Sequence, residues 1–187
     1  MYELDEHTPY RHARYQSTPL PLIQRGLAFH EAGHTVLGQL AGFTCELVRV
    51  HPITRDGFTG WTGATTWARS FGTYLDVAVV CGAAGQAADL HQLAEAGRLT
   101  SETARLCTAE HDKQMALSIL AAAGVQVTET GPAPDGGLAW DDVMATARQR
   151  VEREWDRITA VAEALLAAPG FTLTGTQAAQ IAGITTA

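Results

Sequence analysis

Residues 27–43 read LAFHEAGHTVLGQLAGF and contain the pattern HExxH, in which His30 and His34 stand four positions apart and Glu31 follows the first histidine. Residues i and i+4 lie one turn apart on the same face of an α-helix, so both imidazoles can direct a ring nitrogen at one metal ion about 2.0 to 2.1 Å away. Glu31 stands beside them, where it can take a proton from water at the metal. The stretch therefore predicts a helix with a catalytic zinc site.

A motif this short also arises by accident. With 7 histidines in 187 positions, a random order of the same residues contains HExxH in roughly 1 to 2% of cases. The surrounding residues favour the metal site, because unliganded polar groups are costly to bury on an apolar helix face. The face that carries the motif consists of Leu27, His30, Glu31, His34, Leu37, Gly38 and Ala41.

Length and composition are typical of one soluble globular domain. The chain has 187 residues, of which 46% are hydrophobic and 18% charged, a balance that favours neither disorder nor a membrane protein. Residues 1–18 lack periodicity and predict a flexible N-terminal arm, which leaves residues 19–187 as a single metallopeptidase-like domain. The net charge of -7 excludes a typical nucleic-acid surface, which gathers Lys and Arg.

The cysteines and the N-terminus predict a cytoplasmic protein. Cys45, Cys81 and Cys107 are widely spaced and form no CxxC pair, so we expect buried thiols in a reducing compartment. The polar, acid-bearing start lacks the basic and apolar regions of a signal peptide. No stretch approaches the roughly 20 apolar residues that span a bilayer.

Periodicity predicts a mainly helical α+β fold with a small sheet. The second strand is rich in Gly and Thr, which favours a place at the sheet edge. The expected elements are a helix over 21–41 ended by Gly42, strands over 47–53 and 58–67, helices over 74–96, 101–123 and 139–168, a loop over 130–137, and a last helix opened by the capping box Thr174–Gln177. The 74–96 helix carries small residues, CGAAGQAA, that let a neighbouring helix approach closely.

A catalytic zinc needs a third protein ligand and keeps one position for water. Asp112 is the best candidate, because it is a lone carboxylate on an otherwise apolar helical stripe. The alternative is a structural role, with Asp112 bonded to an arginine such as Arg105. The stripe contains Ala109, Asp112, Met115, Ala116 and Ile119.

Other histidines and acids fit less well. Glu110 faces Lys113 and Gln114, a typical solvent-exposed arrangement, and its neighbour His111 falls beside polar residues. His51 stands at a strand before a proline, and His91 stands among polar helix residues. Isolated histidines of this kind are mostly exposed or hydrogen bonded.

Four stretches resemble, in the same order, the peptidase domain of FtsH-type AAA zinc metalloproteases. They are AFHEAGHTVLGQLAG, VRVHPITRDGFTGWT, GAAGQAADL and AEHDKQMAL, and with the C-terminal helices the likeness covers about residues 19–183. The resemblance implies a zincin-like fold in which His30, His34 and Asp112 bind zinc and Glu31 is the general base. It matches Asp89 to an acidic residue at the end of the family's Gly- and Ala-rich helix.

The chain departs from the family in two respects. The segment before Asp112 carries extra helical residues, and the ATPase motor domain and membrane anchor of the family have no counterpart. We therefore expect a stand-alone zinc endopeptidase that is ATP-independent by itself and cleaves unfolded or extended polypeptide. The strand around 58–66 would either pair with the substrate by β-augmentation or cap the core, and Trp61 and Trp67 would line a subsite or pack in the core.

Two other readings remain open. In one, the domain is a catalytically idle, zinc-stabilised binding or assembly module that docks to a separate ATPase or a substrate protein. The presence of Glu31 argues against it, since a structural site needs no base. In the other, the HExxH pattern is a coincidence within a helical domain that binds no metal.

Overall fold

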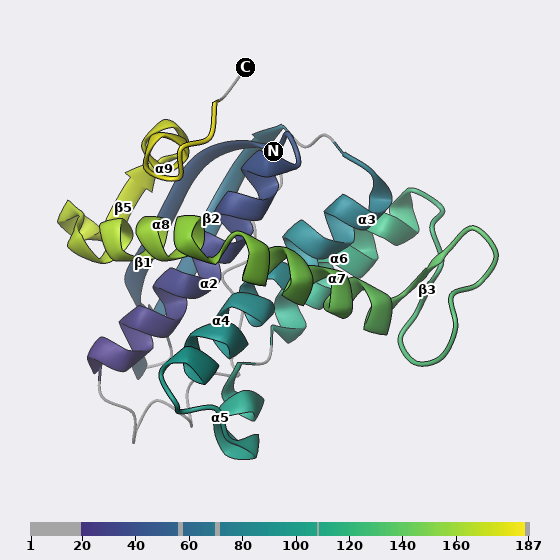
Figure 1. The fold of residues 1–187 in the computed structure, drawn as a ribbon, viewed down its shortest axis with the longest axis horizontal. Coiled ribbons are helices and arrows are strands. Elements are labelled where there is room, and N and C mark those ends of the chain that lie inside the picture. Colours follow the sequence, from purple (N-terminus) through teal and green to yellow (C-terminus); the bar gives the residue numbers. More distant parts are fainter. Residues whose placement is uncertain (1–19, 56–57, 70–71, 108, 186–187) are drawn as a thin grey trace.

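The structure, a computed structural model, describes residues 20–55, 58–69, 72–107 and 109–185. It is mainly helical with a small sheet, which confirms the predicted α+β class (Figure 1). The arm predicted for residues 1–18 lies outside the described residues. In chain order the elements are α2 (Leu20–Leu40), β1 (Thr44–Arg55), β2 (Phe58–Arg69), α3 (Tyr74–Val77), the π-helix η2 (Ala78–Ala83), α4 (Ala84–Glu95), α5 (Ser101–Leu106), α6 (Glu110–Ala122), β3 (Val127–Thr128), β4 (Leu138–Ala139), α7 (Trp140–Arg153), α8 (Trp155–Ala167), the 3-10 helix η3 (Pro169–Phe171), β5 (Thr172–Thr174) and α9 (Gly175–Ile181).

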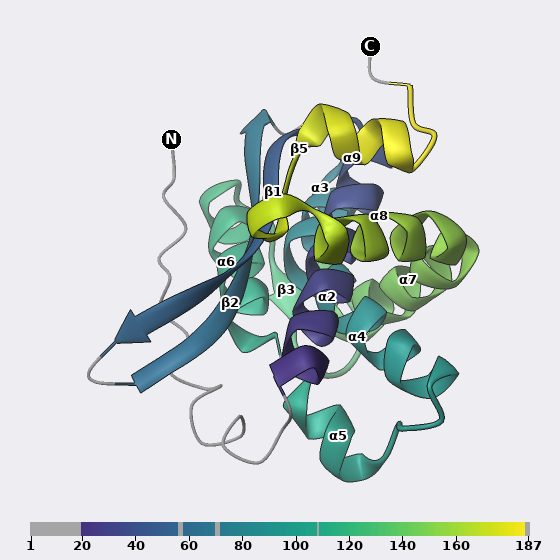
Figure 2. The same ribbon diagram turned by 90° about the vertical axis from the view of Figure 1, so that its left-hand side faces the viewer.

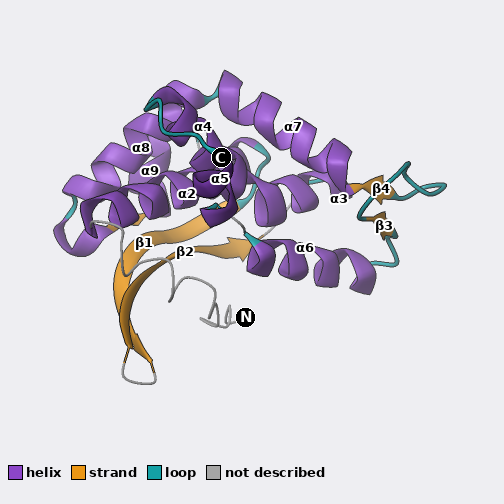
Figure 3. Cartoon of the chain, turned by 90° about the horizontal axis from the view of Figure 1, so that it is seen from below, coloured by secondary structure: helices purple, strands orange, loops and turns teal. Residues whose placement is uncertain are grey.

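The main sheet has three strands in the order β2-β1-β5. β1 pairs with β2 along its length in antiparallel register, and its residues 47–49 pair with β5. Within the described residues β2 pairs with β1 alone, so the predicted edge strand is confirmed. Figure 3 shows the two long strands as a curved ribbon beside the helices. The short strands β3 and β4 were not predicted, whereas the loop over 130–137 between them was.

The helix that carries HExxH is the centre of the fold. α2 lies between the sheet and helices α4 and α8 (Figures 1 and 2), and 14 of its 21 residues are buried. Gly42 follows it with a φ of 84°, a left-handed conformation that suits glycine at a helix end. The sequence predicted this helix within one residue at each end.

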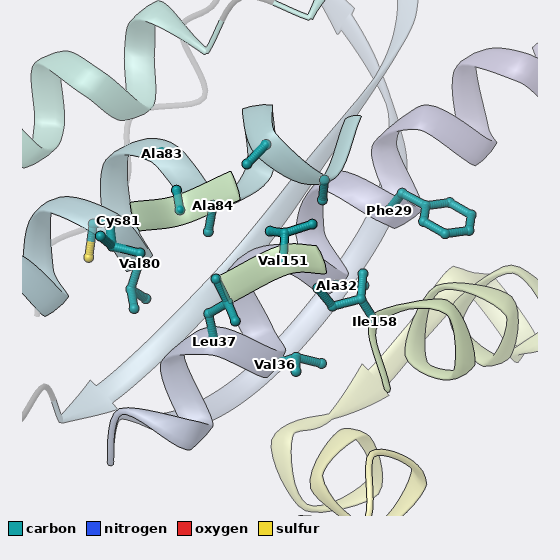
Figure 4. Packing of buried hydrophobic residues seen from close by; sticks show 14 of the residues in the cluster. Phe29, Ala32, Val36, Leu37, Val80, Cys81, Ala83, Ala84, Val151 and Ile158 are labelled. Carbon is teal, nitrogen blue, oxygen red and sulfur yellow. The ribbon is translucent and has the colours of Figure 1, made fainter. Parts of the chain in front are cut away.

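Small residues let α2 and α4 approach closely, as the sequence predicted. A Cβ on Gly33 would lie 2.8 Å from the carbonyl oxygen of Ala84 and 2.8 Å from Cβ of Ala88. The surrounding core is apolar and close-packed, and burial of this apolar surface stabilises the fold. Figure 4 shows its members from several helices, including Phe29, Ala32, Val36, Val80, Ala83, Ala84, Val151 and Ile158.

Three predicted helices are divided in the structure. The 74–96 helix contains the π-helical segment η2, the 101–123 helix is broken between α5 and α6, and the 139–168 helix is broken at Glu154. Glu154 has φ -103° and ψ 16°, outside the helical range. The break lets α7 pack on α4 and η2 while α8 packs on α2. The single helices predicted for 101–123 and 139–168 were therefore wrong, because tertiary packing overrides a continuous helical pattern.

The last helix and the cysteines agree with the sequence. α9 begins at the predicted capping box, in which Thr174 accepts from the Gln177 N–H and the Gln177 side chain accepts from the Thr174 N–H. All three cysteines are buried, and none of them forms a disulfide bond. Of the helices in the described ranges, none has both the length and the apolar character needed to cross a bilayer.

Candidate metal centre

Three side chains converge at one point. His30 and His34 come from α2, and Asp112 comes from the first turn of α6. The Nε2 atoms of the two histidines lie 3.1 Å apart, and Oδ2 of Asp112 lies 3.0 Å from Nε2 of His30 and 3.7 Å from Nε2 of His34. Two donors on a tetrahedral zinc ion lie ~3.3 Å apart, given bonds of about 2.0 to 2.1 Å. The trio therefore has the spacing of three ligands around one ion.

Hydrogen bonds behind the rings fix which nitrogen faces the centre. Nδ1 of His30 lies 3.0 Å from Oδ2 of Asp89, and Nδ1 of His34 contacts the carbonyl oxygen of Val80. A carboxylate and a carbonyl only accept hydrogen bonds, so each Nδ1 carries the proton and donates it. Each Nε2 is then the nitrogen that faces the other ring and Asp112, and once deprotonated it can offer a lone pair to a metal ion, as in many histidine metal sites.

Val80 reaches His34 from an unusual helical segment. It lies in η2, and Ala84, the first residue after this segment, donates its N–H to the carbonyl of Val79 in the i to i+5 pattern of a π-helix. Such segments shift the hydrogen bonding of a helix and are frequent at functional sites. This contact could not be predicted from the sequence, because residues 74–96 have an ordinary helical pattern.

The electrostatics of the trio favour a cation. Burial would lower the pKa of His30, but the charge of Asp89 and the hydrogen bonds of Asp112 and Asp89 outweigh it and raise that pKa well above 6.5. Burial would raise the pKa of Asp112, but hydrogen bonds from His30 and His34 hold it well below its ordinary value. Two imidazole nitrogens and the Asp112 carboxylate, with the carboxylate of Asp89 behind His30, fit Zn²⁺, which binds imidazole nitrogen and carboxylate oxygen.

Gly85 makes room for His30. A Cβ on Gly85 would overlap the imidazole ring at Nε2, Cδ2 and Cε1. The close approach of α4 to α2, predicted from small residues, thus also leaves room for the His30 ring. Only the absence of a side chain at this position leaves space for that ring.

Glu31 is buried beside the trio and faces the edge strand. Its side chain is only slightly exposed, at 6%, and its Oε2 atom lies 2.8 Å from Oγ1 of Thr65 on β2. The sequence predicted Glu31 as the general base but did not predict its contact with Thr65, since that contact depends on how β2 lies against α2. It also matched Asp89 to the family without giving it a contact.

The structure brings together the three side chains that the sequence predicted as metal ligands. Among the described residues, no second trio of His, Cys, Asp or Glu converges in this way. Glu110 accepts from Gln114 at 2.8 Å on the helix surface, as predicted. His51 contacts the carbonyl of Pro52, and His91 packs on Trp155 with ring centroids 4.2 Å apart.

The predicted apolar stripe around Asp112 needs one correction. Ala116 is fully buried in line with Asp112, but Ile119 is 44% exposed and Leu120 is buried in its place. The inward face of α6 therefore follows Asp112, Ala116 and Leu120 at intervals of four. The ion pairs of Asp112 are with His30 and His34, and the Arg105 side chain lies outside the described part.

Comparisons with known proteins do not identify a family. A scan against protein-family models and a search of curated proteins each gave no match. The resemblance to FtsH-type peptidase domains therefore stays a prediction that rests on the sequence motifs.

The two tryptophans of β2 make packing contacts. The ring of Trp61 lies 5.5 Å from that of Phe171, and the ring of Trp67 lies 5.6 Å from that of Phe43. Trp67 also covers Gly38 of α2, where a Cβ would overlap the indole. These contacts favour a core role over the alternative of a substrate subsite.

Proposed function

We propose that the chain is a zinc-dependent endopeptidase of the FtsH-like kind that cleaves unfolded or extended polypeptide and needs no ATP of its own. The observation that carries the proposal is the convergence of His30, His34 and Asp112 next to a buried Glu31. A purely structural zinc site is closed by four protein ligands, whereas a catalytic site has three and leaves a position for water.

Each residue has a distinct task in this proposal. His30, His34 and Asp112 hold the ion, and Asp89 and the Val80 carbonyl orient the two rings. A zinc ion held at this site would supply polarisation of the scissile carbonyl and would lower the pKa of water towards about 7. Glu31 accepts a proton from that water and returns it to the leaving amine, the usual double duty of a general acid and base.

The edge strand β2 supports the choice of an extended substrate. Its outer edge is free of pairing within the described residues, and its Thr65 contacts Glu31. A peptide that pairs with this edge would lie next to the base. Main-chain pairing of this kind binds many sequences, because it reads the backbone and not the side chains.

Two measurements test the proposal. Elemental analysis after purification without added zinc should find about one zinc per chain, and the native chain should hydrolyse casein. Glu31→Gln should keep the zinc and lose hydrolysis, whereas Glu152→Gln, on the exposed side of α7, should keep both. Zinc without hydrolysis would favour the binding or assembly module that docks to a separate ATPase or a substrate protein, and absence of metal would favour coincidence.

A further inference from the structure

A pair of buried hydroxyl groups joins the edge strand to the helix of the metal centre. Oγ1 of Thr65 lies 2.8 Å from Oε2 of Glu31 and 3.3 Å from Oγ1 of Thr35. Thr35 is fully buried and Thr65 is 5% exposed. The carboxylate of Glu31 is thus contacted from β2, an element that supplies no metal ligand.

The hydrogen of Thr65 can be assigned from these contacts. A hydroxyl has one hydrogen to donate, and three acceptors lie near Thr65: Oε2 of Glu31, the Glu31 carbonyl at 3.3 Å and the Thr35 hydroxyl. The carboxylate is nearest, and a hydrogen bond to an ionised oxygen is the strongest of the three. Thr65 therefore donates to Glu31 and remains free to accept from Thr35.

The strand is shaped to receive this carboxylate. Gly63, Thr65 and Trp67 alternate along β2 and face α2 together. A Cβ on Gly63 would overlap Oε1, Cγ and Cδ of Glu31, while Trp67 lies against Gly38 two turns further along the helix. Glycine gives the Glu31 side chain space, and threonine gives one of its oxygens a hydrogen bond.

We propose that Thr65 is a positioning residue for the general base. Its hydroxyl holds Oε2 of Glu31, which leaves Oε1 as the oxygen that accepts the proton from water. Among the described residues, Thr65 is the side chain that donates a hydrogen bond to this carboxylate. Loss of the Thr65 hydroxyl would therefore let the Glu31 carboxyl group rotate. This inference rests on the proposed peptidase function.

Kinetics of three variants test the proposal. Thr65→Val keeps the shape of the side chain and removes the hydroxyl, so kcat on a peptide substrate should fall roughly 10- to 100-fold while KM and zinc content stay unchanged. Thr65→Ser restores the hydroxyl and should recover most of kcat. The matched control is Thr66→Val, because Thr66 is exposed and points to the other face of β2. An unchanged kcat in Thr65→Val, or an equal loss in Thr65→Ser, would overturn the proposal.

A crystal structure of each variant gives a readout that does not need activity. The Glu31 carboxylate should be displaced or rotated in Thr65→Val and should keep its place in Thr65→Ser. If the native chain binds zinc but hydrolyses nothing, the peptidase proposal fails and this comparison alone decides the role of Thr65. An undisturbed Glu31 in Thr65→Val would then contradict it. Thr65→Ala serves as a second hydroxyl-free variant if Thr65→Val does not fold.

Discussion

Nδ1 of His30 lies 3.0 Å from Oδ2 of Asp89, a residue 59 positions later in the chain. Both side chains are buried, so the contact is shielded from water and the charge of Asp89 acts strongly on the ring. A carboxylate behind a metal-binding imidazole fixes its tautomer and makes the other nitrogen a better ligand. Asp89 therefore supports the candidate metal centre from behind the His30 ring.

Asp89→Asn should weaken zinc binding roughly 10- to 100-fold. The amide can still accept the hydrogen bond, but it removes the negative charge that favours the metal-bound ring. Competition with a chromophoric chelator measures the change in Kd. Asp156→Asn, at an exposed position of α8, is the control and should bind zinc as the native chain does. Equal affinity in both variants would show that Asp89 has no influence on the ion.

Gly85→Ala should abolish or severely weaken zinc binding, because the added methyl group occupies the place of the His30 ring. Overpacking of this kind also costs about 1 to 3 kcal/mol of stability. Gly26→Ala is the matched control on α2, where a Cβ would lie 3.9 Å from Asp89 in ordinary contact. That change should keep zinc and stabilise the helix by about 0.5 to 1 kcal/mol. Thermal unfolding and zinc titration of both variants check this prediction.

The three side chains that converge could be predicted from the sequence because their signals are local. His30 and His34 are linked by the geometry of one helical turn, and Asp112 stands out as a carboxylate on an apolar face. The edge position of β2 likewise follows from its own composition. In each case the residues that carry the information lie within a few positions of one another.

The supporting contacts could not be predicted, because they join segments that are distant in sequence. Thr65 contacts Glu31 because of the way β2 packs against α2. Val80 contacts His34 because Val80 lies in a π-helical turn. The break before α6 was also missed, since the residues on either side favour a helix. Ala109, with φ -104° and ψ 51°, leaves the helical conformation there, and the break sets where α6 begins.

Removal of zinc should lower the thermal stability. A ligand present at 100 times its Kd stabilises the folded state by about 2.7 kcal/mol, which for a chain of this size corresponds to about 5 to 10 °C in Tm. Differential scanning calorimetry with excess zinc and with EDTA measures the difference. Asp112→Ala, which lacks one ligand, should show a much smaller shift. A native Tm that does not respond to EDTA would contradict a metal site that is coupled to folding.

Zinc binding should release close to one proton per chain at pH 7.5. In the metal-free protein the carboxylates of Asp89 and Asp112 overcome burial and raise the pKa of His30 from 6.5 to about 10, so the ring is protonated and zinc must displace that proton. An ordinary histidine would release only about a tenth of a proton at this pH. The raised pKa also means that the protonated ring stabilises the metal-free fold below pH 6.5, and that this stabilisation is lost as the pH rises through about 10.

Isothermal titration calorimetry in two buffers of different ionisation enthalpy counts the protons. Asp89→Asn should release fewer than the native chain, and a count near zero in the native chain would show that His30 holds no proton before zinc arrives.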